Sequence, residues 1–167
     1  MFHQSGRINS ERDLAEKKQY EEWVKQFNKL FNEFLQNIRI IMNSMSVSEK
    51  YVNVSNQYEL LTRRCYYSTC LFRTFKIVEI CILSLEPTKE NIAILYKIHG
   101  LSSAIFKHMR RSININIIPP SSSEYSDIAR IATNNSMMLE KLKKGETLTD
   151  VELPNVEPPN DCCCVIC

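Results

Sequence analysis

The chain has 167 residues, of which 44% are hydrophobic and 24% charged, a size and composition that fit one globular domain. Its 21 basic and 19 acidic residues give a net charge of +2, which offers no general attraction to nucleic acid. The three glycines Gly6, Gly100 and Gly145 lie too far apart for a phosphate-binding loop, so we expect no nucleotide ligand either.

The first residues are polar and lack the basic and apolar regions of a signal peptide, and Phe2 stands where N-myristoylation requires glycine. We therefore expect a cytoplasmic protein whose cysteines are thiols. Residues 1–9 are expected to be disordered, and a helical domain is expected over 10–145. Its four predicted helices cover about 11–45, 47–85, 88–112 and 123–144.

The first predicted helix starts at Ser10, whose hydroxyl can cap the amide of Asp13. Hydrophobic residues then recur at steps of three and four, which is the spacing of an amphipathic helix. They are Tyr20, Trp23, Phe27, Leu30, Phe34, Ile38, Ile41 and Met45. At 1.5 Å per residue, a helix of about 35 residues would be about 50 Å long, so the architecture should be elongated.

The second predicted helix has the spacing of a capping box at Ser46 and Glu49. A heptad seam follows, made of Val47, Tyr51, Val54, Tyr58, Leu61, Cys65, Ser68, Phe72 and Phe75. Hydrophobic residues then surround the helix from Leu71 to Leu85, which predicts burial on several sides. This run is too short and too charged to span a membrane. A short turn after the first helix predicts antiparallel packing of the two.

Pro87 ends this helix and Thr88 can cap the third, whose hydrophobic residues include Ile92, Leu95, Ile98, Ile105 and Met109. The alternating Ile113, Ile115 and Ile117 would continue this helix or form an extended connector. A proline- and serine-rich linker precedes the fourth helix, which should stop at Gly145. The predicted fold class is all-α, either an elongated helical bundle or a long antiparallel helical hairpin with two further helices, followed by a disordered C-terminal tail.

Residues 146–161 contain acidic residues and prolines but no Lys or Arg. Such a segment cannot bury enough apolar surface to offset its ordering entropy, so we interpret it as a disordered tether. The cysteine-rich residues 162–167 follow it. The tether would let a modifying enzyme reach the terminus and hold the helical domain clear of a bilayer.

The segment Cys164-Val165-Ile166-Cys167 has the spacing of a CaaX prenylation signal, with Cys164 as the modified thiol. Val165 and Ile166 supply the two aliphatic positions, and Cys167 at the last position favours the shorter farnesyl chain over geranylgeranyl. Because a single lipid gives marginal membrane binding, the adjacent Cys162 and Cys163 are candidate palmitoylation sites. The last six residues resemble the tails of dual-lipidated signalling and trafficking proteins.

Metal or redox chemistry is the alternative for this tail, although consecutive cysteines without a CxxC pair or a nearby histidine suit a tetrahedral site poorly. Three other cysteines lie within predicted helices and are expected to be small buried hydrophobic residues: Cys65, Cys70 and Cys81. His99 and His108 have no acidic partner at a matching spacing, so we expect no catalytic role for them. No catalytic residues, metal site or cofactor are predicted.

The sequence thus favours a noncatalytic helical adaptor or tether, peripheral on the cytosolic face of a membrane, with protein partners bound through helical surfaces. Its lipid anchor would be prenyl with candidate palmitoyl groups, and its role would lie in signalling or membrane trafficking. The alternative is a soluble helical subunit of a multiprotein complex, with an incidental or metal- or redox-linked cysteine tail. The pattern does not indicate which helical residues bind a partner.

Overall fold

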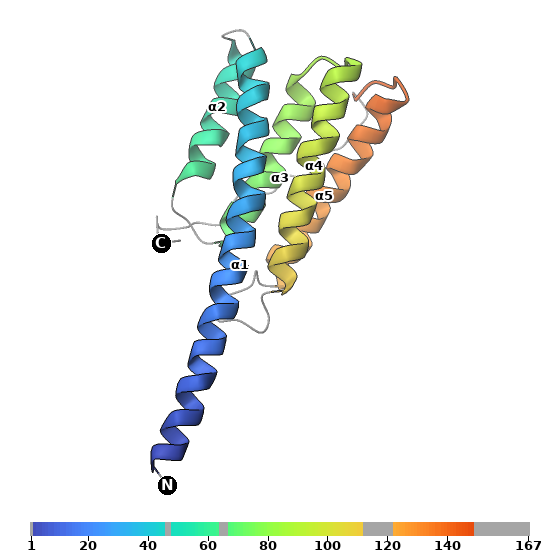
Figure 1. Cartoon of the computed structure of the whole chain (residues 1–167). Coiled ribbons are helices and arrows are strands. Elements are labelled where there is room, and N and C mark those ends of the chain that lie inside the picture. Colours follow the sequence, from blue (N-terminus) through green and yellow to red (C-terminus); the bar gives the residue numbers. More distant parts are fainter. Residues whose placement is uncertain (1, 46–47, 64–66, 112–121, 149–167) are drawn as a thin grey trace.

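The computed structural model describes residues 2–45, 48–63, 67–111 and 122–148, with side chains from residue 10 onward except residue 122. Five helices follow one another in the described chain: α1 (Phe2–Ser44), α2 (Glu49–Thr62), α3 (Tyr67–Ser84), α4 (Lys89–Arg110) and α5 (Ser122–Lys143). They form a bundle from which the N-terminal part of α1 projects (Figure 1). The predicted all-α elongated bundle is confirmed.

Helix α1 begins at Phe2, well before the predicted start at Ser10, so the expectation of disorder through residue 9 was wrong. Ser10 lies inside the helix and caps nothing. No proline interrupts this stretch, so nothing in its backbone prevents the helix from starting early. The predicted hydrophobic stripe is confirmed farther along, where its buried members are Trp23, Phe27, Phe34, Ile38 and Ile41.

The predicted helix over 47–85 is divided in two, because α2 ends at Thr62 and Arg63 has an extended backbone with φ −73° and ψ 149°. The chain resumes as α3 at Tyr67, beside α2 (Figure 1). The heptad seam therefore does not form one continuous surface. Its described buried members lie on two helices, Val54 and Leu61 on α2 and Phe72 and Phe75 on α3, and Val47 and Cys65 lie outside the described residues.

The division of the predicted helix allows other helices to pack around α3 and bury its hydrophobic side chains. Helix α3 packs against α2, α4 and α5, and it contains the most heavily buried run in the described chain, as the sequence predicted. Even the charged Arg73 is buried, with its Nη1 donating to the Leu60 carbonyl at 2.9 Å and so linking α3 to α2. Glu79 is also buried and pairs with Lys76 at 3.1 Å.

Of the four predicted capping residues, Thr88 and Gly145 match the helix ends, whereas Ser10 and Ser46 do not. Thr88 caps α4, where its hydroxyl accepts from the Asn91 amide at 3.1 Å. Gly145 follows α5 with φ +77°, and its amide donates to the Leu142 carbonyl at 3.0 Å. The cap of α2 is Ser48 and not Ser46, because the Ser48 hydroxyl accepts from the amide of Tyr51 at 3.4 Å.

Candidate functional site

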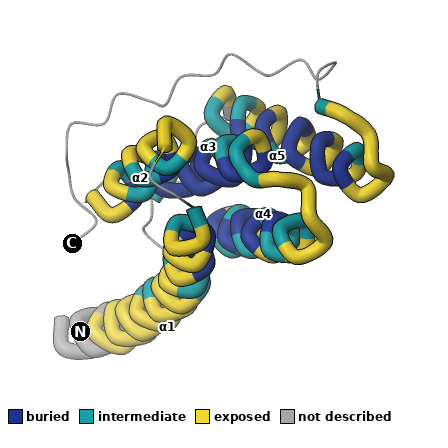
Figure 2. Tube along the Cα trace, turned by 90° about the horizontal axis from the view of Figure 1, so that it is seen from above, coloured by how far each residue is buried: buried dark blue, intermediate teal, exposed yellow. Residues whose placement is uncertain are grey.

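The predicted lipidation residues all lie outside the described residues, which stop at Leu148. These are Cys162, Cys163, Cys164, Val165, Ile166 and Cys167. The structure does describe the start of the acidic segment, where the turn at Gly145 reverses the chain and Leu148 packs against the core. Figure 2 shows this end of the described chain on the side of the bundle opposite α1.

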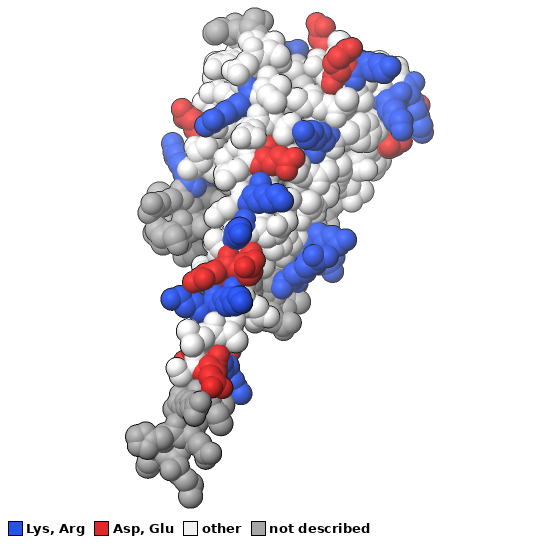
Figure 3. Space-filling model, in the orientation of Figure 1, with Lys and Arg blue, Asp and Glu red and all other residues white. Residues whose placement is uncertain are grey.

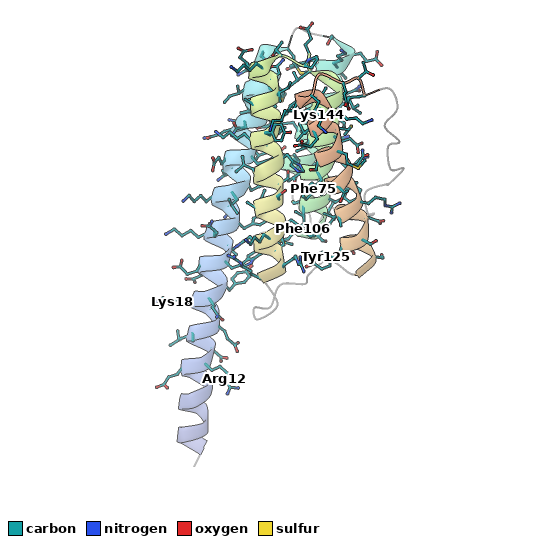
Figure 4. All side chains as sticks on the ribbon, turned by 90° about the vertical axis from the view of Figure 1, so that its right-hand side faces the viewer. Arg12, Lys18, Phe75, Phe106, Tyr125 and Lys144 are labelled. Carbon is teal, nitrogen blue, oxygen red and sulfur yellow. The ribbon has the colours of Figure 1, made fainter. Side chains whose placement is uncertain are left out.

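The N-terminal part of α1 extends beyond the other helices, and every side chain from Ser10 to Gln19 is exposed (Figure 2). Figure 4 shows Arg12 and Lys18 on this part, away from the bundle. Opposite charges recur at a spacing of four, as in Asp13–Lys17 and Lys18–Glu22, and Figure 3 shows the two signs interleaved along the helix. Each such pair stabilises a helix by about 0.2–0.5 kcal/mol, which allows α1 to continue without packing.

An aromatic cluster anchors α1 where it leaves the bundle. Trp23 Nε1 donates to the His108 carbonyl at 3.2 Å, and His108 Nε2 donates to the Trp23 carbonyl at 2.9 Å. The two rings stack with centroids 4.8 Å apart, and Trp23 also stacks on Phe27 at 5.5 Å. Tyr67 meets Trp23 edge-on at 5.0 Å. The pKa of Tyr67 is raised, mainly because the hydroxyl is buried and to a smaller extent because Tyr20 lies beside it. This cluster joins α1, α3 and α4.

A groove with a volume of about 510 Å³ runs along the outside of the bundle between α1 and α4. It is lined by Lys29, Asn32, Glu33, Gln36, Asn37 and Ile40 of α1 and by Lys97 of α4. Ile40 is 56% exposed. Asn37 is held in place, since its Nδ2 donates to the Glu33 carbonyl at 2.8 Å. Three amide side chains, three charged side chains and one aliphatic side chain therefore line the groove.

The other residues considered from the sequence take structural positions. Cys70 and Cys81 are buried cysteines, and burial raises the pKa of Cys81 to about 12. His108 of α4 belongs to the aromatic cluster. His99, also on α4, is partly buried, with its ring edge-on to Phe75 of α3. Within the described ranges, no group of three metal-ligating side chains is close enough to hold an ion. None of the described helices is both long and apolar enough to cross a bilayer.

Buried polar residues on α3, α4 and α5 form a feature that sequence reasoning missed. Asn135 is fully buried, and its Nδ2 donates to the Phe75 carbonyl at 3.0 Å, while its Oδ1 has no hydrogen-bond partner among the described residues. Ser102 is also fully buried, and its hydroxyl has no hydrogen-bond partner in the described part of the chain. A hydrophobic pattern gives no signal for such residues, because each occupies one position on an otherwise apolar face.

We expect His99 to make stability depend on pH. Its Nδ1 is buried with no hydrogen-bond partner among the residues that the structure describes, its ring meets Phe75 edge-on at 6.5 Å, and burial lowers its pKa from the ordinary 6.5. The unfolded chain therefore binds a proton more readily than the folded chain. This contribution to stability is complete above pH 6.5 and is lost as the pH falls toward the lowered pKa.

Urea unfolding between pH 8 and 5 tests this expectation. The slope due to one group cannot exceed about 1.4 kcal/mol per pH unit. The parent chain should lose stability toward pH 5 more steeply than the H99Q variant, in which this group is absent. Parallel curves for the two proteins would show that His99 does not contribute to the pH dependence.

Comparison with protein-family models, with curated proteins and with solved structures found no match to this chain.

Proposed function

We propose that the protein is a noncatalytic helical adaptor or tether, held at a cytosolic membrane surface by a lipid on Cys164. The observation that carries the proposal is the segment Cys164-Val165-Ile166-Cys167, which combines a thiol with two aliphatic residues at the spacing that prenyl transfer requires. Cys162 and Cys163 support it, because palmitoylation there would supply the second lipid that stable anchoring needs. The proposal requires Cys167 to be the last residue of the translated chain.

The projecting part of α1 supports an adaptor role. Residues 2–22 span about 30 Å at 1.5 Å per residue, so this helix can present a surface at a distance from the bundle. From Ser10 to Gln19 its side chains are mostly polar or charged, with Leu14 and Ala15 as the exceptions, and a largely polar helix fits a spacer between two bodies. The bundle would then bind proteins through helical surfaces in signalling or membrane trafficking, while the lipid tail sets its location.

Replacing Cys164 by serine should move the protein from the membrane fraction to the soluble fraction of cells. The C162S and C163S variants each keep the prenyl group and one candidate palmitoylation site. Each should therefore lower membrane association less than C164S does. Immunoblotting of separated fractions gives the distribution. Cys81→Ser is the matched control, because this buried thiol lies in the bundle and not in the tail. Unchanged membrane association of the C164S variant would refute the anchor and favour a soluble subunit.

A further inference from the structure

The groove between α1 and α4 contains two lysines that lack ionic partners. Lys29 and Lys97 come from different helices and line the same groove, with Glu33 as its acidic residue. The ion pairs between described residues do not involve any of these three side chains. Two unpaired ammonium groups beside one carboxylate leave the groove with an excess of positive charge, which suits an anionic occupant.

The amide side chains indicate the form of that occupant. Asn32 and Gln36 are exposed along the groove, and each offers both a donor and an acceptor. A helix satisfies its own backbone groups, whereas an extended chain has free N–H and C=O groups that such amides can bind. Ile40 adds one exposed aliphatic contact. An extended acidic peptide therefore fits this surface better than a helix or a lone anion.

The chain itself contains a segment with these properties. Residues 149–161 include four carboxylates and three prolines but no Lys or Arg: Asp150, Glu152, Glu157 and Asp161, with Pro154, Pro158 and Pro159. Proline fixes its own φ near about −65° and favours extended conformations at the preceding residue. We propose that this acidic segment docks in the groove between α1 and α4 of the same chain.

The length of the segment selects the residues that make the contact. The described chain ends on the side of the bundle opposite α1, so the segment has to extend around the bundle to reach the groove (Figure 2). From Leu148, an extended chain reaches about 30 Å at Glu157 and about 44 Å at Asp161. Because Glu157 and Asp161 lie farthest from Leu148 along the segment, we expect these two carboxylates, rather than Asp150 and Glu152, at Lys29 and Lys97.

Attachment to the bundle makes such docking effective even when each contact is weak, because a short linker gives an effective concentration in the millimolar range. Docking would also bring Cys162, Cys163 and Cys164 to the α1–α4 face of the bundle. The inference does not depend on lipidation, since it concerns the acidic residues that precede the cysteines.

Carbodiimide coupling of the full chain tests the proposal, because this reagent joins a lysine to a carboxylate in direct contact. Mass spectrometry should find Glu157 or Asp161 joined to Lys29 and Lys97. Lys25 and Lys107 are matched controls, exposed on the same two helices but outside the groove, and should couple at least several-fold less. Even coupling across all four lysines would overturn the proposal.

Charge reversal provides the second arm. K97E should lower the yield of the Lys29 cross-link about tenfold, which corresponds to about 1.4 kcal/mol, whereas K107E should leave it unchanged. An equal effect of K97E and K107E would contradict a specific site. A mixture of ¹⁵N-labelled and unlabelled chains identifies the source of the segment. Cross-links within one chain are expected, and predominantly mixed cross-links would instead place a second copy in the groove and overturn the intramolecular assignment.

Discussion

Replacing Trp23 by alanine should lower the free energy of unfolding by about 3–5 kcal/mol, the usual cost of deleting a buried Trp or Phe side chain. Trp23 is 6% exposed and touches residues from α1, α3 and α4, so its loss removes packing on three helices at once. It also leaves the His108 carbonyl without its indole donor. For a domain with a typical stability of 5–15 kcal/mol, this is a large fraction of the total.

Chemical unfolding monitored by far-UV circular dichroism measures this change, because Trp23 is the single tryptophan and its replacement removes the fluorescent probe. The W23F variant keeps an aromatic ring but loses the Nε1 hydrogen bond, so it should cost much less than W23A. L14A is the control on the projecting part of α1, where Leu14 is 65% exposed, and should change stability by less than about 0.5 kcal/mol. Equal costs for W23A and L14A would contradict the aromatic anchor.

Replacing Phe75 by alanine should have a similar cost, about 3–5 kcal/mol. Phe75 is fully buried on α3 and lies among the helices in Figure 4, with its ring edge-on to Phe106 at 6.1 Å and to His99 at 6.5 Å. The small alanine side chain would leave a cavity where α3 meets α4. This cavity would lie next to the backbone carbonyl of residue 75, which accepts a hydrogen bond from Asn135. The cavity adds to the lost transfer free energy because the surrounding helices relax only in part.

Thermal and urea unfolding of F75A and F75L measure this cost, and the leucine variant should lose less because it fills part of the cavity. L83A is the matched control on the same helix, since Leu83 is 43% exposed. A cost for F75A no greater than that for L83A would show that α3 is not the packed centre of the bundle.

The sequence predicted the elements whose signals are local or periodic. The stripe from Trp23 to Ile41 identified the buried face of α1, and the side chain of Thr88 and the glycine at 145 marked two helix ends correctly. These signals depend on 3.6-residue periodicity and on capping chemistry, which neighbouring residues determine. The same local reasoning placed Cys70 and Cys81 in the core.

The division between α2 and α3 could not be predicted in this way. Hydrophobic spacing stays favourable through Leu61 and Phe72, and no glycine or proline lies between them. The tertiary arrangement decides, because α3 must be surrounded to bury Phe72 and Phe75, and a continuous helix would leave part of that surface exposed. The start of α1 was missed for the opposite reason, since its first turns are helical without any packing stripe.

The two candidate sites differ in the same respect. The lipidation segment is a linear motif, so the sequence alone identifies Cys164 and its neighbours. The groove combines Lys29 and Lys97, which are far apart in the sequence and meet because α1 and α4 pack together. No spacing rule within one helix could have brought these two lysines together.

Mass spectrometry of the native C-terminal peptide tests the proposed membrane anchor most directly. We expect a peptide that ends at Cys164, has lost Val165, Ile166 and Cys167, and carries a thioether-linked isoprenoid. Acyl groups removable by hydroxylamine should be present on Cys162 or Cys163. An unmodified peptide ending at Cys167, or a chain that continues beyond it, would contradict the lipid-anchored account.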